Sequence, residues 1–275
     1  MSGTDKPITP EFDAKASLNG MFDLLGQVAF IPGGYGGLGE AIAHGLSLYG
    51  ARVIIGGRDI AKANALAKKI EQTSGIEAAA VVLDVTDVAS IRGAIDQVVA
   101  RFGRLDTLVN CVGIQIEQPL TEVTEEAFDR VYQTNLKSAM FLAQAAAKVQ
   151  IAGRRGGRQI HLLSVRSQLA IRGKGYSAYT ASKGGLVMLV KQHAMELAPH
   201  GITVNGVAPT FVNTEMIRHV YERPEFKEEI LARIPLGRIA DPRDVVAPVL
   251  FFAAPASAFV TGQILYVDGG ITASQ

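Results

Sequence analysis

A tyrosine and a lysine four positions apart, Tyr179 and Lys183, could carry proton-transfer chemistry. In a helix this spacing puts both side chains on one face. A free tyrosine has a pKa of about 10, too high for efficient acid–base work at neutral pH. A nearby ammonium favours the phenolate and lowers that pKa, so the pair could exchange a proton with an alcohol or a ketone. The alternative is an ordinary structural pair on a helix face.

A second candidate for chemistry is a cluster of five glycines between residues 33 and 39, which follows a short apolar run and precedes a helical pattern. Glycine allows positive φ and lets backbone N–H groups approach a pyrophosphate at a helix N-terminus. Two spacings fit a dinucleotide-binding turn, Gly34-x-Gly36-x-x-Gly39 and Gly33-x-x-x-Gly37-x-Gly39. A glycine-rich turn without a ligand is the alternative.

The residues after the next apolar run address the choice between NAD and NADP. They read Gly57-Arg58-Asp59. An NAD site usually has a carboxylate at the tip of this strand to bind the ribose 2′-OH, whereas an arginine nearby favours a 2′-phosphate. Gly57 stands where that acid would be, and the Arg58 guanidinium could bind a phosphate in a bidentate manner. We therefore predict NADP(H), with NAD(H) as the alternative if Asp59 is the acid and Arg58 is only a solvated residue.

These residues need elements to position them, and the chain alternates between short apolar runs and helical patterns. Strands are predicted at Gln27–Ile31, Ala51–Ile55, Ala78–Leu83, Thr107–Val109, Gln159–Leu163, Thr203–Val207 and Gln263–Val267. Helices are predicted after the glycines, at 60–73, 88–102, 124–150 and 177–197, and near 242–254. Seven buried strands separated by helices indicate an α/β fold with a doubly wound parallel sheet, the Rossmann arrangement, covered by helices on both faces.

Composition limits the classes of function. The chain has 275 residues, 27 Lys+Arg against 26 Asp+Glu, and one cysteine. A near-neutral charge gives no global field for nucleic acid or an anionic membrane. One cysteine excludes an internal disulfide, and the N-terminus lacks the apolar core of a signal peptide, so we expect a cytoplasmic protein. No apolar run is long enough to span a membrane. We expect a lead-in over residues 1–20 and a single domain over 21–275.

The ordered motifs resemble the short-chain dehydrogenase/reductase family from about residue 22 to residue 275. The motifs that carry the resemblance are Gly33-x-x-x-Gly37-x-Gly39, Leu83-Asp84-Val85, Asn110-Cys-Val-Gly113, Thr134-Asn135-Leu136, the strand that ends at Ser164, Tyr179-x-x-x-Lys183, Asn205-Gly-Val-Ala-Pro209 and Thr261–Gly270. The resemblance selects the second glycine spacing.

The resemblance also implies roles. Tyr179 would be the general acid/base, Lys183 would lower its pKa and bind the nicotinamide ribose, Ser164 would bind the substrate oxygen, and Asn135 would hold a water in a proton relay. The residues expected to contact the cofactor are Gly33, Tyr35, Gly37, Leu38, Gly39, Arg58, Asp84, Val85, Asn110, Gly113, Tyr179, Lys183, Pro209, Val212 and Thr214. A non-enzymatic nucleotide sensor on the same fold is a further alternative, although such proteins commonly lose the tyrosine or the lysine.

Three positions depart from the family pattern: Pro32 replaces a threonine, Cys111 an asparagine and Thr210 a glycine. They bear on turn stability and cofactor affinity. For Cys111, packing is favoured over chemistry. The five histidines, His44, His161, His193, His200 and His219, show no metal-ligand spacing, so no metal is expected.

The substrate is expected between the loops at 114–119, 165–176 and 210–233. Arg166, Arg172 and Gln115 could contact it, and an arginine there suits a carboxylate. The segment at about 210–235 resembles a mobile lid, although its charges could equally be a solvated helix face. Several stretches resemble the gluconate 5-dehydrogenase branch, and the rival is a 3-oxoacyl carrier-protein reductase. Against that rival, Arg154, Arg155 and Arg158 are expected at the far end of the sheet. Members of the family commonly assemble as tetramers, so the resemblance implies a homotetramer.

Overall fold

The computed structural model describes residue 18, residues 20–214 and residues 224–273, without the side chains of residues 224–227. Most of the lead-in expected over residues 1–20 therefore lies outside the described residues. So do several charged residues of the expected lid, namely Glu215, Arg218, His219, Glu222 and Arg223.

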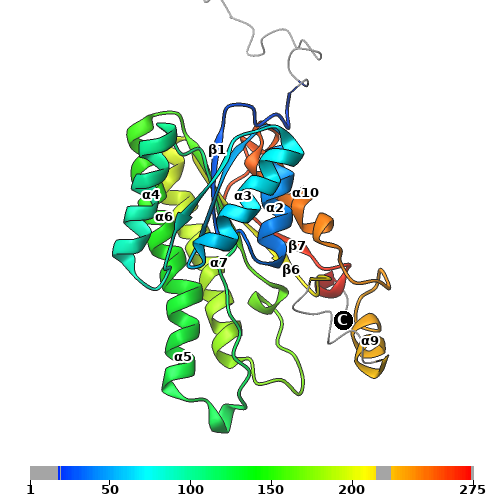
Figure 1. The fold of residues 1–275 in the computed structure, drawn as a ribbon. Coiled ribbons are helices and arrows are strands. Elements are labelled where there is room, and N and C mark those ends of the chain that lie inside the picture. The colour runs from blue at the N-terminus through cyan, green and yellow to red at the C-terminus, as the bar shows by residue number, and fades with distance from the viewer. Residues whose placement is uncertain (1–17, 19, 215–223, 274–275) are drawn as a thin grey trace, which may run out of the picture.

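Seven strands form one parallel sheet at the centre of the molecule (Figure 1). In spatial order they are β3 (Ala78–Val82), β2 (Arg52–Gly57), β1 (Val28–Pro32), β4 (Thr107–Asn110), β5 (Gly157–Leu162), β6 (Ile202–Pro209) and β7 (Ile264–Val267). The predicted fold class is confirmed. The order of the strands reverses between β1 and β4, and ligands of open α/β sheets bind at the carboxyl ends of the strands at such a switch point.

Helices cover both faces of the sheet, which explains why a central strand such as β1 is buried along its whole length and does not alternate. On one face lie α2 (Gly37–Leu48), α3 (Ile60–Ser74) and α10 (Pro242–Ala253), and their apolar sides form one core cluster with residues such as Ile31 and Ile55. On the other face lie α4 (Val88–Phe102), α6 (Ser138–Gly153) and α7 (Ser177–Leu197), packed on residues such as Phe30 and Val204 (Figure 1).

The stretch predicted as one helix over 124–150 is interrupted. It comprises α5 (Glu125–Tyr132), a π-helical turn (Gln133–Lys137) and α6. A π turn inserts one extra residue into the helical ladder, and such turns are frequent at functional sites. This one carries Asn135, whose side chain is buried.

The remaining elements are short. α9 (Pro224–Leu231) lies in the charged segment for which no helix was predicted. Short 3₁₀ turns occupy Leu120–Glu122, Val165–Ser167, Ala198–His200, Pro255–Ser257 and Ile271–Ala273. No helix among the described residues is long and apolar enough to cross a membrane.

Candidate active site

The four residues expected to act in catalysis come from three elements at the carboxyl edge of the sheet. Ser164 follows β5, Asn135 comes from the π turn, and Tyr179 and Lys183 come from the first turns of α7. Ser164, Asn135 and Lys183 are 9%, 1% and 3% exposed. Ser164 Oγ accepts the N–H of Arg166 at 3.1 Å, and hydrogen bonding by Ser164 is the largest cause that opposes the raised pKa of Tyr179. The fold therefore brings the serine close to the tyrosine.

Asn135 fastens the loop after β4 to α7. Its Oδ1 accepts the N–H of Ile114 at 2.8 Å, and its Nδ2 donates to the Ile114 carbonyl at 2.9 Å and to Ser182 Oγ at 3.1 Å. Both amide hydrogens thus have protein partners. In this structure Asn135 is a clamp on the loop, and its role with a water stays a prediction.

Lys183 is buried against the end of β5. Its Nζ donates to the Leu162 carbonyl at 2.7 Å and lies 5.8 Å from the centre of the Tyr179 ring. Burial lowers the pKa of Lys183 to about 8, partly opposed by the neighbouring Cys111. A Cβ on Gly113 would lie 3.3 Å from Nζ, so a larger residue at this position would crowd the ammonium.

The expected lowering of the Tyr179 pKa by Lys183 is not produced by the protein's own groups. Burial raises the pKa of Tyr179, and the opposing contributions come from the Ser164 hydrogen bond and the charge of Arg166. Lys183 is not among the causes of this shift, and its ammonium donates to the Leu162 carbonyl at the end of β5. Tyr179 is therefore a neutral phenol at neutral pH, which is the form that can donate a proton.

The glycine turn has the shape that a dinucleotide needs. A Cβ on Gly39 would lie 2.5 Å from the Gly33 carbonyl, and Gly33 has a φ of 74°. The N-cap of α2 is Gly36, which has no side chain to cap the first amides of the helix, and both Gly36 and Gly37 are exposed. An uncapped, exposed helix N-terminus can bind a pyrophosphate through its backbone N–H groups, so this turn fits the pyrophosphate of a dinucleotide cofactor.

The tip of β2 carries the residues that concern the adenosine ribose. Arg58 is exposed, and its charge is among the causes that lower the pKa of Asp84, after the hydrogen bonds from Thr86. Asp59 is the N-cap of α3, because its carboxylate accepts the N–H of Lys62 at 3.0 Å. The Asp59 carboxylate, which was the alternative ligand for the ribose, therefore caps α3.

The residues expected along the rest of the cofactor lie around the same switch point. Asp84 turns its carboxylate to the N–H and hydroxyl of Thr86, at 2.9 and 2.7 Å, and Val85 packs on the core under α4. Asn110 ends β4, Pro209 ends β6, and Leu38 packs on the core under α2.

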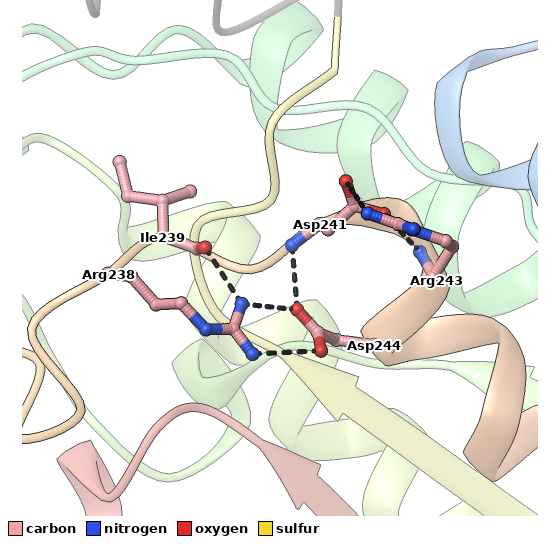
Figure 2. A network of polar contacts seen from close by, with 5 residues as sticks. All are labelled: Arg238, Ile239, Asp241, Arg243 and Asp244. Atoms are coloured by element: carbon pink, nitrogen blue, oxygen red, sulfur yellow. Dashed lines mark hydrogen bonds and ion pairs between the residues drawn. The ribbon is translucent and has the colours of Figure 1, made fainter.

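A network of polar contacts lies at the start of α10 (Figure 2). Asp241 and Asp244 form a capping box, and Arg238 binds both oxygens of Asp244, at 2.6 and 3.0 Å. The preceding Ala240 bridges to the segment of Val212, and its carbonyl accepts the N–H of Asn213 at 2.8 Å. Thr214 follows, with its Cγ2 only 3.3 Å from where a Gly37 Cβ would lie. The fold thus brings Thr214 to the glycine turn.

Comparison with known proteins gives the family. Residues 34–272 match the family model described as enoyl-(acyl carrier protein) reductase. The chain is 35% identical over 254 residues to gluconate 5-dehydrogenase of Gluconobacter oxydans, covering 92% of this chain and 98% of the relative. The chain belongs to the short-chain dehydrogenase/reductase family. It is therefore an NAD(P)-dependent oxidoreductase that acts on CH–OH groups.

Two further relatives of this short-chain dehydrogenase/reductase differ in the class of substrate that their names give. One is 3-oxoacyl-[acyl-carrier-protein] reductase of Thermotoga maritima, 38% identical over 251 residues and covering 90% of this chain and 98% of the relative. The other is the crystal structure of a gluconate 5-dehydrogenase from Burkholderia cenocepacia in complex with NADP and tartrate. It superposes with a TM-score of 0.88 at 36% identity and covers 93% of this chain and 99% of that one.

The residues expected near the substrate are brought to the site unequally. Burial is the largest cause that lowers the pKa of Arg166, and the charge of Arg233 lowers it further. Tyr176 and Tyr179 oppose this shift. Its Nη1 donates to the Ala170 carbonyl at 2.9 Å. Gln115 is exposed beside the clamped Ile114, and Arg172 is also exposed.

The three departures from the family pattern lie in turns at this edge. Pro32 is the last residue of β1, and its carbonyl accepts the N–H of Cys111 at 3.0 Å. Burial raises the pKa of Cys111 to about 12, which keeps the thiol protonated and unreactive. The Thr210 hydroxyl is buried and has no partner among the described residues.

Sequence analysis missed a functional neighbour, His161. It is 1% exposed on β5, and its Nδ1 lies 3.4 Å from Nδ2 of Asn110. Because β5 also contains Arg158 and Gln159, the polar type of His161 did not single it out in the sequence. Among the described residues, no group of three His, Cys, Asp or Glu side chains could hold a metal ion.

Proposed function

We propose that this enzyme uses NADP(H) to interconvert the keto and hydroxyl forms of a small sugar acid, in the manner of a gluconate 5-dehydrogenase. The observation that carries the proposal is the charge of Arg166, which acts on the Tyr179 phenol and lowers its pKa, because a cation near the phenol suits a carboxylate on the substrate. The gluconate 5-dehydrogenase relatives support the same substrate class.

The protein's own residues handle the proton. In reduction, the neutral phenol of Tyr179 donates a proton to the carbonyl oxygen that becomes the alcohol, and the Ser164 hydroxyl holds that oxygen in line. Lys183 supplies a buried positive charge beside the cofactor ribose, and Asn135 keeps the loop of Ile114 in place. The nicotinamide, when bound, gives or takes the hydride.

The preference for NADP(H) is proposed from the tip of β2. Gly57 offers no carboxylate, and Arg58 is exposed and free to meet a 2′-phosphate. Arg58→Asp should raise the Michaelis constant for NADPH and favour NADH. An unchanged Michaelis constant for NADPH in this variant would refute the assignment.

A substrate panel tests the proposed activity. Oxidation of NADPH is followed with 5-keto-gluconate and related keto acids, with 3-oxoacyl thioesters and with neutral diketones. We expect the keto sugar acids to give the highest kcat/KM. Preference for 3-oxoacyl thioesters would establish the rival activity, which the 38% identical relative favours. The basic residues Arg154, Arg155 and Arg158 do not support that rival, because they lie between α6 and the start of β5, at the edge opposite Ser164.

We also propose a cytoplasmic homotetramer built from one domain over residues 21–275, with the segment at about 210–235 as a lid. Exposed apolar side chains on α6 and α7, such as Met140, Met188 and Met195, support buried contacts between subunits. A sedimentation mass near that of one subunit would refute the tetramer.

A further inference from the structure

The aromatic ring of Tyr35 occupies the space beside Gly57 at the tip of β2. A Cβ built on Gly57 would lie 2.0 Å from Cε1 of Tyr35, 2.7 Å from Cζ and 2.9 Å from the hydroxyl oxygen. Any side chain at position 57 would thus start inside the ring. This is the position from which a strand-tip carboxylate binds the ribose 2′-OH in NAD enzymes.

The ring is held in that place from two sides. The Tyr35 hydroxyl accepts the N–H of Asp59 at 3.2 Å, and Asp59 in turn caps α3. The ring also packs on the core cluster that lies under α2 and α3. Moving the side chain away would cost both the hydrogen bond and part of this packing.

We propose that Tyr35 is a specificity-determining residue for the cofactor, because its ring fills the volume that an acid at position 57 would need. The ring closes the route to recognition of the ribose diol, and Arg58 is left as the charged group at the strand tip. This inference rests on the proposed NADP(H) preference. It adds that a carboxylate at position 57 changes the preference only after the ring has been removed.

Four variants test this coupling by direct binding: Gly57→Asp, Tyr35→Ala, and Gly57→Asp combined with Tyr35→Ala or with Tyr35→Phe. Dissociation constants for NADPH and NADH are measured by calorimetry, and the rise in Tm that each cofactor produces is measured in parallel. Gly57→Asp alone should weaken both cofactors. With Tyr35→Ala it should bind NADH about 10-fold or more tighter than without it, which corresponds to about 1.4 kcal/mol of binding free energy. Tyr35→Ala alone should not produce this gain, and the difference between the two effects is the coupling.

The Tyr35→Phe combination is the matched control, because it keeps the ring and removes the hydroxyl. It should behave like Gly57→Asp alone. If Gly57→Asp by itself shifts the preference to NADH as far as the combination with Tyr35→Ala does, the ring is not a barrier and the proposal is wrong.

Folding provides a second readout that needs no cofactor. Gly57→Ala places only a methyl group against the ring, so it should lower the midpoint of urea unfolding in the wild type, and it should lower the midpoint much less in the Tyr35→Ala background. Additive effects of the two substitutions would overturn the proposal. A wild-type enzyme that binds NADH more tightly than NADPH would refute the proposed preference instead, while the coupling between positions 35 and 57 would still be measured.

Discussion

Acid should destabilise this protein through a histidine that lies beneath the active site. His161 is 1% exposed, and burial, together with the nearby charges of His193 and Lys183, lowers its pKa from 6.5 to about 3. Its Nδ1 faces the amide of Asn110, and its Nε2 has no partner within the described part of the chain. The folded protein therefore keeps His161 neutral at pH values where the unfolded chain protonates it.

The sign and size follow from the difference in bound protons. Below pH 6.5 the unfolded state binds one more proton than the folded state at this residue, so stability falls as the pH falls towards 3. Integrated from about pH 7 to about pH 5, His161 should remove about 2 kcal/mol from the free energy of unfolding.

Urea unfolding followed by circular dichroism at a series of pH values measures the effect. His161→Asn should lose about 2 kcal/mol less than the wild type between about pH 7 and pH 5, whatever its offset at neutral pH. His200→Asn is the matched control, since His200 is exposed at the end of a 3₁₀ turn and its loss should leave the wild-type slope in place. Parallel curves for the wild type and His161→Asn would refute the argument.

Three further outcomes concern the site itself. Tyr179→Phe should lower turnover by about 100-fold or more while calorimetry still detects NADPH binding, since only the proton donor is removed; near-normal turnover would remove Tyr179 from its role. Arg166→Leu should raise the Tyr179 pKa and move the alkaline limb of the kcat/KM profile for reduction to higher pH, whereas Arg172→Leu in the same loop should not. Gly39→Ala should destabilise the fold by about 1–3 kcal/mol and weaken NADPH binding, because its Cβ would lie 2.5 Å from the Gly33 carbonyl; thermal unfolding and calorimetry measure both.

The fold was predictable from the sequence because the strands are buried on both faces. Runs such as Val53-Ile54-Ile55 have no amphipathic alternation, and each is followed by a turn and a helical period, which together specify a parallel sheet. The predicted strand boundaries differ from the observed ones by at most two residues, as at β6, which extends to Pro209. The break between α5 and α6 was not predictable in this way, because the inserted residue of a π turn leaves the apolar pattern on both sides intact.

The sequence predicts the candidate site as a set of residues, and it does not predict the contacts between them. The spacing of Tyr179 and Lys183 predicts a shared helix face, but it does not show that the ammonium bonds to the Leu162 carbonyl. Likewise, Tyr35 and Gly57 lie on different elements, and only the folded chain brings the ring over the strand tip. Spacing specifies neighbours along one element, whereas the pKa values and the cofactor pocket depend on neighbours from other elements.

The loop after β4 shows how such contacts support the chemistry. Asn110 fixes its start, with Oδ1 on the N–H of Val112 and Nδ2 beside His161, and Asn135 fixes its end through both backbone groups of Ile114. Gly113 lies between these two points, and a Cβ added to it would lie 3.3 Å from Nζ of Lys183. Because Lys183 is buried and its pKa is lowered to about 8, a small shift of this loop would change both the space around the ammonium and the fraction of Lys183 that is protonated. The two asparagines and the histidine therefore hold the loop whose Gly113 faces Lys183.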